Sequence, residues 1–375
     1  REFLESWIGP GEVHVRSSAL VLLADIREAA VLDDLLAAAG DSDRDFRRQA
    51  LELASRAPGE AATNRWIVRA AELRGDPLAD VLAMLGKRGD KAALPAIVER
   101  IGDEDAAVRL AAIEAAVRLG GDEVFETIRP LLVTDDADQA RVVKEAYLSI
   151  PGPRPVAAAA ELLPGAPDPA AVAIIGILTE RRAIDHAGAV AALAASGSAE
   201  VRKAAIAGLE ILARPSEIPV LIEFLAGAPA GPETAALQNT LVAAANRIDD
   251  PEARADAILA AAERISAVKR ADFIRPLARI GGRRALKAAI AAIGAPEPQI
   301  RAAGLYALSN WKDISALDPL FAAARPPADR RTRTLCLQGI ARLCGDPAVG
   351  PGRAVALLND ALSLAVEPEE RAAVG

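Results

Sequence analysis

Residues 103–116 read DEDAAVRLAAIEAA and decide the fold. The motif holds an acidic turn, an apolar residue followed by Arg, and a small residue three positions after the Arg; here these are Val108, Arg109 and Ala112. It returns at Val15-Arg16 with Ala19, Phe46-Arg47 with Ala50, Val201-Arg202 with Ala205, and Ile300-Arg301 with Gly304. The copies lie about 30 residues apart, or a small multiple of that, which is typical of stacked supersecondary units rather than one closed globule.

Each copy of the motif predicts an amphipathic helix that begins at its apolar residue. After Val108, apolar side chains recur at Ala112, Ala116 and Leu119, which is the spacing of a helix with one face in a core. We expect the small residue of each copy to let the neighbouring helix approach closely. Acidic or Pro-containing turns precede the copies and are expected to cap the helix N-termini; they are Asp41-Ser42-Asp43, Asp103-Glu104-Asp105, Ser198-Ala199-Glu200 and Pro296-Glu297-Pro298.

Another apolar helix precedes each turn, so each unit is predicted to be helix, turn, helix. We count about twelve such units, which suits a solenoid whose units pack only on their neighbours. The predicted spans are 1–26, 27–57, 60–89, 91–120, 122–150, 154–182, 185–213, 216–248, 252–282, 284–311, 314–344 and 351–375. We therefore predict a single all-α solenoid over residues 1–375, with an irregular junction in the Pro- and Gly-rich stretch 151–169.

Composition and net charge limit the classes of function that the chain can have. Hydrophobic residues make up 52% of the chain but aromatic residues only 3%, so small aliphatic side chains must form the core. The net charge of −8 argues against a nucleic-acid partner, since nucleic-acid-binding domains usually carry a basic surface. No apolar run reaches the roughly 18–20 residues of a membrane span. Because the chain begins at Arg1 without Met and the last unit has no polar cap, we expect a fragment of a longer protein.

The motif at residues 103–116 resembles the HEAT repeat, in the short bacterial form also called the phycobilisome-lyase HEAT-like repeat. The resemblance covers nearly the whole chain. Residues 307–313 (ALSNWKD), followed by Ala316-Leu317 and Pro319-Leu320, are similar to the closing repeats of large multidomain bacterial HEAT proteins. The resemblance implies an α-α superhelix whose usual work is to hold protein partners.

The leading functional prediction is a non-catalytic scaffold that binds protein partners on an extended concave surface formed by the second helices. We expect no cofactor, and we expect the isolated fragment to be monomeric. One alternative is a HEAT-like enzyme or lyase subunit that acts on a small molecule, which needs clustered titratable or aromatic groups. Another is a nucleic-acid-binding HEAT-like protein of the alkyl-base glycosylase type, which needs a basic concave face and a carboxylate in the groove.

The residue types that carry most catalysis and metal binding are sparse. His14 and His186 lie far apart in the chain, so we predict no shared metal site and no His-based triad. Cys336 and Cys344 are eight residues apart, which on one helix is about 12 Å along the axis. A disulfide needs Cα atoms within about 7 Å, so both are predicted to be free thiols.

A calcium-loop pattern overlaps one of the turns. Acidic residues fall at loop positions one, three, five and twelve, namely Asp41, Asp43, Asp45 and Glu52. Position six must be Gly for the sharp turn, and Phe46 stands there. We therefore predict a capped turn between two helices at this place and no calcium site.

Two sets of basic residues are candidate sites. The arginine ladder is the Arg of each motif copy, predicted to pair with acidic turn residues or carbonyls of a neighbouring unit; it comprises Arg16, Arg47, Arg109, Arg202 and Arg301. The basic zone is a candidate patch for an anionic partner; it comprises Lys269, Arg270, Arg275, Arg279, Arg283, Arg284, Lys287, Arg330, Arg331 and Arg333. The alternative for this zone is a solvated face whose counter-charges come from other repeats.

Within the basic zone, Arg275 and Arg279 are expected to share a helix face at i, i+4. Arg283 continues that face if the helix persists through Gly281-Gly282. Arg325 lies in the same zone, shortly before its second cluster. Of the three tryptophans, Trp311 occupies an apolar position of its motif copy and is predicted to pack in the core, whereas the places of Trp7 and Trp66 stay open.

Overall fold

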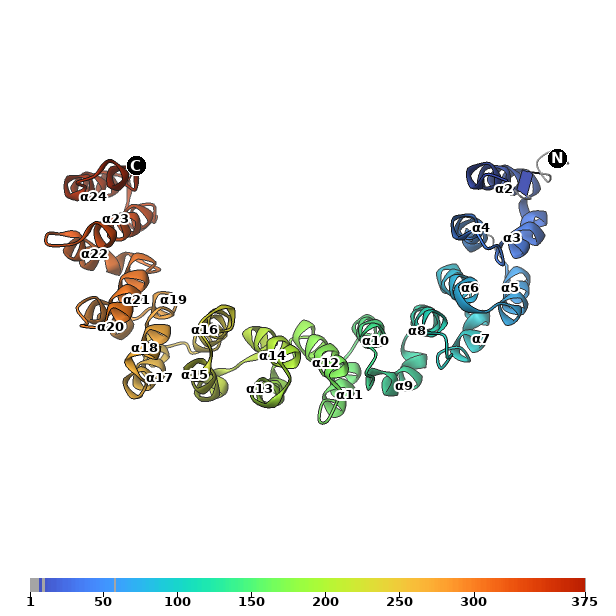
Figure 1. The fold of residues 1–375 in the computed structure, drawn as a ribbon, viewed down its shortest axis with the longest axis horizontal. Helices are drawn as coiled ribbons and strands as arrows, with labels where there is room; N and C mark the ends of the chain where they lie inside the picture. The colour runs from blue at the N-terminus through green and yellow to red at the C-terminus, as the bar shows by residue number, and fades with distance from the viewer. Residues whose placement is uncertain (1–6, 9–10, 57–58, 375) are drawn as a thin grey trace. The chain divides into compact units, whose positions relative to one another are not determined.

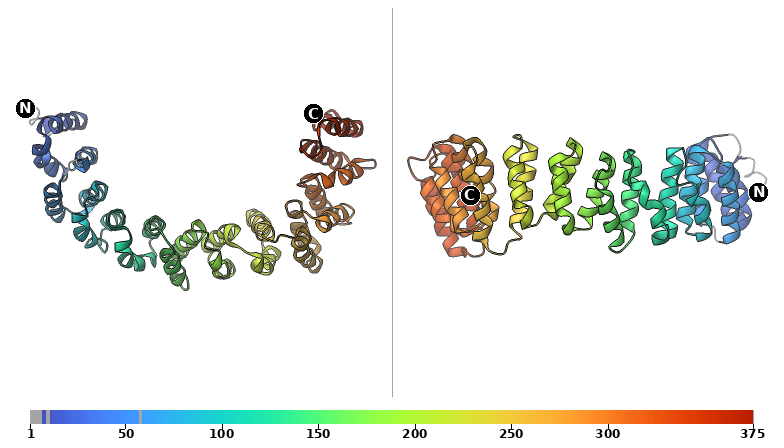
Figure 2. Two further views of the ribbon diagram at one scale, coloured as in Figure 1. Left: turned by 180° about the vertical axis from the view of Figure 1, so that it is seen from behind. Right: turned by 90° about the horizontal axis from the view of Figure 1, so that it is seen from below.

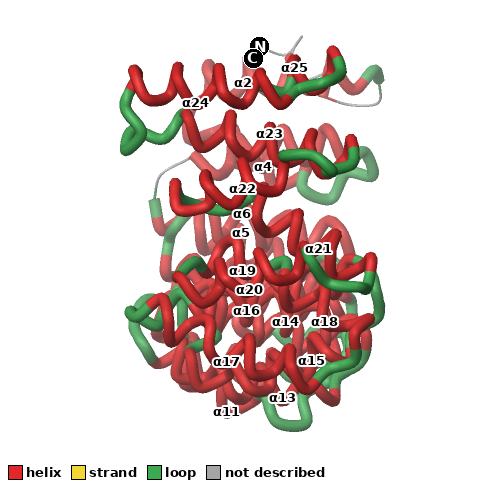
Figure 3. The backbone as a smooth tube through the Cα atoms, turned by 90° about the vertical axis from the view of Figure 1, so that its left-hand side faces the viewer, coloured by secondary structure: helices red, strands yellow, loops and turns green. Residues whose placement is uncertain are grey.

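The computed structural model describes residues 7–8, 11–56 and 59–374, and its regular structure is helical throughout these ranges. No strand occurs in them (Figure 3). The all-α prediction is confirmed, and helix pairs follow the predicted repeat spans closely. The chain divides into two compact units, unit 1 at Arg1–Arg181 and unit 2 at Arg182–Gly375. The predicted junction at 151–169 includes a short helix and falls within unit 1, and a single solenoid over 1–375 stays a prediction.

Unit 1 is a row of helix pairs in two layers (Figure 1). Successive second helices pack on one another in one layer, and the shorter first elements form the other layer. The second helices are α2 (Val13–Arg27), α4 (Arg44–Arg56), α6 (Gly75–Arg88), α8 (Ala106–Gly120), α10 (Ala137–Ser149) and α12 (Asp168–Glu180). The first elements are η1 (Glu28–Val31), α3 (Leu32–Ala38), α5 (Glu60–Glu72), η2 (Lys91–Ala93), α7 (Leu94–Val98), η3 (Gly121–Val124), α9 (Phe125–Ile128), η4 (Arg129–Leu132) and α11 (Arg154–Leu162).

Unit 2 repeats this arrangement, and its helices also run side by side (Figure 2). Its second helices are α14 (Ala199–Leu212), α16 (Pro232–Ala245), α18 (Ala267–Ile274) with α19 (Leu277–Ile280), α21 (Pro298–Ser309), α23 (Arg330–Cys344) and α25 (Pro368–Ala372). Its first elements are η5 (Ile184–His186), α13 (Ala187–Ser196), η6 (Pro215–Glu217), α15 (Ile218–Gly227), α17 (Pro251–Arg264), α20 (Arg283–Ile293), η7 (Ile314–Ala316), α22 (Leu317–Ala324) and α24 (Pro351–Leu364).

The repeat at 252–282 departs from the regular pattern. Its second helix is split at Pro276, because proline has no N–H to donate and its ring clashes with the preceding turn. The helix then ends at Gly281 and Gly282, which have φ values of 74° and 92°. The helix does not persist through these glycines, so Arg283 begins α20 and does not continue the face of Arg279.

Short side chains cap the second helices as predicted in three of the four turns. Asp43, Asp105 and Ser198 each accept a hydrogen bond from a backbone N–H two or three residues later. The fourth expectation is wrong, because Glu297 stands at the N-cap of α21 without a side-chain cap bond. Asp, Asn, Ser and Thr are favoured at this position because a short side chain places its oxygen against the first turn, and Glu is longer by one methylene.

Four of the five apolar residues that open the motif copies are buried as predicted, namely Phe46, Val108, Val201 and Ile300, whereas Val15 is half-buried. A Cβ on Gly304 would lie 2.7 Å from the Cβ of Ala292 in α20, so this small residue does let the two helices come close.

The large and reactive side chains are mostly buried. Trp66 on α5 and Trp311 just after α21 are fully buried, whereas Trp7 is 44% exposed. Cys336 and Cys344 are free thiols as predicted, and both are buried; desolvation raises the pKa of the Cys336 thiol to about 12. These thiols therefore belong to the core of α23.

Candidate functional site

The arginine ladder connects neighbouring repeats in unit 1. Arg47 is only 4% exposed, and its Nε and Nη2 donate to the Asp80 carboxylate on α6 at 3.2 and 2.9 Å. Its Nη1 donates to the Asp41 carbonyl at 2.8 Å in the turn before its own helix. One guanidinium thus holds a turn of its own repeat and a carboxylate of the next, and Asp80 neutralises its charge.

Other members of the ladder repeat this geometry. Arg109 donates to the Gln139 amide oxygen at 2.8 Å, to the Asp136 carboxylate at 3.2 Å and to the Asp103 carbonyl. Arg202 pairs with Glu233 at 2.9 Å. The first member, Arg16, pairs with Asp41, and the resulting hydrogen bond holds the pKa of Asp41 below its usual value. The acidic turn that resembles a calcium loop is thus occupied by this ion pair and by the cap of α4.

Arg301 lacks this second contact. It is exposed, and its Nη1 donates to the carbonyls of Ala295 and Pro296 in its own turn. The next second helix, α23, begins with Arg330 and Arg331 and offers no carboxylate within ion-pair distance of Arg301. Arg301 therefore carries a charge that its neighbouring repeat does not neutralise.

The ladder has three further members, which lie four residues after an N-cap residue, as Arg109 does after Asp105. They are Arg254, Arg270 and Arg333. Arg254 and Arg333 donate to carbonyls in the turn before their helix, Arg270 donates to the Ala262 carbonyl near the end of α17, and Arg333 also pairs with Glu370 at 2.8 Å. Sequence reasoning missed them because no large apolar residue directly precedes the Arg (Ala253, Lys269 and Thr332 stand there), although the spacing from the cap was a usable signal.

A second row of cations, also not predicted, ties the ends of successive second helices. Arg342 donates to the Trp311 carbonyl at 2.6 Å, and Lys312 donates to the Ile280 carbonyl at 2.8 Å. Arg88 and Arg181 make the same contact in unit 1. Helix C-termini leave carbonyls without partners and carry partial negative charge, so each cation stabilises the repeat before it. These residues are therefore structural.

Part of the basic zone is held by acidic groups and carbonyls of unit 2. Arg330 pairs with Glu369 at 3.1 Å, and Arg284 pairs with Asp256. Lys269 reaches the Ala228 carbonyl and lies 3.6 Å from Asp272. With Arg270 and Arg333 in the ladder, these cations have counter-charges or acceptors within the solenoid.

The rest of the basic zone faces solvent. The Arg275 guanidinium lies 5.2 Å from the ring centroid of Tyr306, which is 47% exposed. Arg279 donates to the Asn239 side chain at 2.9 Å. The side chains of Arg283, Lys287 and Arg331 are exposed, and Arg283 keeps only a 3.7 Å contact to Glu252. The exposed cations of the zone thus lie on the second-helix side (Arg275 and Arg279), on α20 (Arg283 and Lys287) and at the start of α23 (Arg331).

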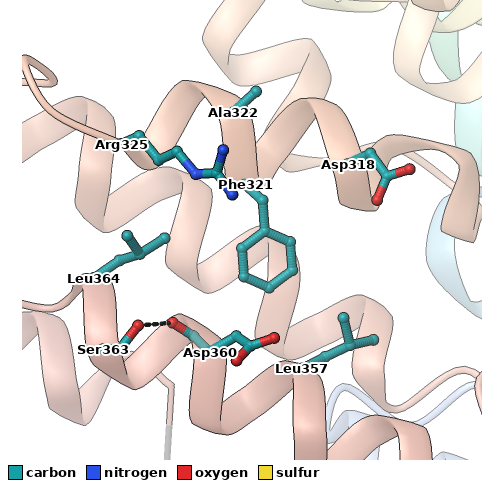
Figure 4. Close-up of a pocket in the computed structure, with 8 residues that line it drawn as sticks. All are labelled: Asp318, Phe321, Ala322, Arg325, Leu357, Asp360, Ser363 and Leu364. Carbon is teal, nitrogen blue, oxygen red and sulfur yellow. Dashed lines mark hydrogen bonds between the residues drawn. The ribbon is translucent and has the colours of Figure 1, made fainter.

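Two open grooves lie in the last repeats of unit 2. The first, of about 600 Å³, separates α22 from α24. Figure 4 shows Phe321 and Arg325 from the α22 side facing Leu357 and Asp360 on α24. The second groove, of about 570 Å³, lies where the repeat of α20 and α21 meets the repeat of α22 and α23. Its polar lining comes from Arg301, Arg325, Asp329, Arg331 and Thr332, and Arg325 lines both grooves.

The comparisons identify the repeats. The family model described as HEAT repeats matches residues 74–148, from α6 into α10. The fold is that of a HEAT-repeat solenoid. No curated protein matches the chain.

Solved HEAT-like structures share the fold at low identity. Kap121p has a TM-score of 0.67 at 10% identity, covering 100% of this chain and 48% of that chain. Kap121p bound to the SUMO protease Ulp1p has a TM-score of 0.70 at 10% identity, covering 99% and 47%. The complex of Kap121p with Pho4p has a TM-score of 0.69 at 10% identity, covering 99% and 48%. The chain spans about half the length of these structures, and the likeness shows the fold alone.

The chemistry of the solenoid surface is that of ion pairing and apolar contact. Among the described residues, no group of three or more His, Cys, Asp or Glu side chains is arranged to hold a metal ion. No helix in the described ranges is long and apolar enough to cross a membrane. The exposed arginines can bind carboxylate or phosphate groups, and Phe321, Leu357 and Tyr306 can contact apolar groups.

Proposed function

We propose that this solenoid is a non-catalytic scaffold that binds protein partners across the exposed face of its second helices. The observation that carries the proposal is the group formed by Arg275 just after α18, Arg279 on α19 and Tyr306 on α21. Arginine and tyrosine are enriched in the parts of protein interfaces that contribute most to binding. Their placement on successive second helices offers a partner a surface rather than a deep pocket.

The comparison structures support this reading of the fold. The karyopherin Kap121p has been solved in complex with Pho4p and in complex with the SUMO protease Ulp1p. A solenoid of the same fold can therefore bind different proteins. Only the mode of binding is extended to this chain. We propose that a monomeric solenoid holds a protein partner on its stacked helices without a cofactor.

The test is affinity capture with the whole chain as bait. Arg275→Glu combined with Arg279→Glu reverses two charges on the proposed face. Arg264→Glu combined with Arg353→Glu reverses two exposed charges elsewhere in unit 2 and serves as the matched control. We expect a stoichiometric protein partner that the wild type and the control retain and the first variant loses.

Two outcomes would contradict the proposal. One is a partner that both variants retain equally, which places binding on another surface. The other is capture of nucleic acid with a steep dependence on salt, because contacts to phosphates release counterions. Circular dichroism of all three proteins ensures that a loss of binding is not a loss of fold.

A further inference from the structure

We propose that Arg301, Arg325 and Arg331 form a binding site for the carboxylates of an acidic peptide segment, in the groove between the repeat of α20 and α21 and the repeat of α22 and α23. The inference rests on the proposed function, because it assumes a protein partner. It concerns a different surface, formed by the first turns of α21 and α23, the turns before them and the ends of the first helices α20 and α22. It also names the chemistry of the segment that would bind there.

The three arginines approach the groove from separate elements. Arg301 comes from the first turn of α21, Arg325 follows the end of α22, and Arg331 lies in the first turn of α23. All three line the same groove of about 570 Å³ and are exposed. Among the described residues, the guanidinium groups of Arg325 and Arg331 form no hydrogen bond or ion pair.

Arg301 lacks the acidic group that neutralises several other ladder members; Arg254 and Arg270 also bind only carbonyls. Arg47, Arg202 and Arg333 each receive a carboxylate from the next repeat. Arg301 has only carbonyls of its own turn, and Asp329, the acid in the groove, uses its oxygens to cap α23 and to bind Thr332. A carboxylate from outside the chain would therefore take the place that Glu370 takes beside Arg333.

The groove suits a peptide rather than a small anion alone. Between the arginines, its walls are apolar and include Ile293, Pro298, Leu305 and the Pro326-Pro327 pair. Arg325 also lines the neighbouring groove, where Phe321 and Leu357 face each other (Figure 4). An acidic residue can pair with the guanidinium groups while an adjacent apolar side chain contacts these walls.

The probe is a fluorescein-labelled peptide of Asp and Glu residues around a single Leu, titrated with the whole chain at low ionic strength. The matched peptide has Asn and Gln in place of the acids. Anisotropy is measured for the wild type, Arg325→Glu, Arg331→Glu and Arg353→Glu. Neither Arg325 nor Arg331 loses a hydrogen bond or an ion pair, although Arg331 also acts electrostatically on Asp329 at the N-cap of α23. Both variants are expected to fold, and hydrogen exchange of α21 to α23 monitors this.

We expect the acidic peptide to bind, and each groove variant to weaken it by about tenfold or more, the effect of losing roughly one charge-assisted hydrogen bond. Arg353→Glu should change the affinity by less than about twofold, and the amide peptide should bind weakly. Three results would overturn the proposal: equal binding of the two peptides, equal binding by all variants, or tighter arginine-dependent binding of a single-stranded DNA oligonucleotide than of the peptide.

The outcome separates this inference from the proposed function. If the peptide fails to bind while partner capture depends on Arg275 and Arg279, only the groove proposal is wrong. If the peptide binds through Arg325 and Arg331 while capture is unaffected by Arg275 and Arg279, only the second-helix surface is wrong. Self-association that the groove variants abolish would show that a second copy of the chain fills the groove, and would also overturn the peptide proposal.

Discussion

Arg109 in unit 1 and Arg301 in unit 2 occupy the same position of the repeat, four residues after the N-cap. Both hold carbonyls of the preceding turn. Arg109 also reaches Gln139 and Asp136 of the next repeat, whereas Arg301 has no such acceptor. The same residue type thus ties two repeats in one place and leaves a charge at a groove in the other. The difference comes from the next repeat rather than from the arginine.

The largest effect is expected where the arginine is buried and fully paired. Arg47→Ala leaves Asp80 without its partner and the Asp41 carbonyl without its donor. We expect a loss of about 3 kcal/mol of local stability. This lies at the lower end of the range for breaking a buried ion pair, because Asp80 is partly exposed to water. Hydrogen exchange of α4 and α6 measures this locally, which suits a repeat protein that need not unfold in one step. A loss below about 1 kcal/mol would mean that the pair does not join the two repeats.

The small residue of the motif also differs between the two repeats, since Gly304 in α21 stands where Ala112 stands in α8. Gly304→Ala places a Cβ 2.7 Å from that of Ala292 and 2.9 Å from the Ala289 carbonyl, so we expect a loss of about 1–3 kcal/mol from overpacking. Ala112→Gly, at the same repeat position in α8, should cost about 1 kcal/mol through backbone entropy. Thermal unfolding checks both. If Gly304→Ala were stabilising, the close approach of α20 and α21 would be wrong.

The pair of Arg333 and Glu370 predicts a dependence on pH in the last repeat. Glu370 is fully buried, and the hydrogen bond that it accepts from Arg333, together with those from the Glu367 and Val366 N–H groups, lowers its pKa from 4.5 to about 2. The stabilisation is therefore complete above pH 4.5 and is lost as the pH falls toward 2. We expect the wild type to be more stable than Glu370→Gln at neutral pH, with the difference shrinking between pH 4.5 and 2. A difference that stays constant over this range would show that the carboxylate charge is not what holds α25.

The periodic part of the fold could be predicted from the sequence, because the motif places apolar, small and basic residues at fixed spacing. Local departures from the repeat pattern could not be predicted in this way. Pro276 and the glycines after it break a helix that i, i+4 spacing alone would continue. Whether each cation has a partner within the chain could not be predicted either. Arg331 and Arg333 are two residues apart, yet Arg333 faces Glu370 and Arg331 faces a groove. Which acid lies across from which arginine depends on the packing of the next repeat.

The repeated arginine stabilises the solenoid where the next repeat supplies an acceptor. The most direct measurement is hydrogen exchange on Arg109→Ala and Arg301→Ala, compared at α8 with α10 and at α21 with α23. We predict a loss of about 2 kcal/mol for Arg109→Ala, since it removes charge-assisted hydrogen bonds across the repeats. Arg301→Ala should lose only about 0.5 kcal/mol, as an exposed residue does. Equal losses at the two sites would contradict the claim.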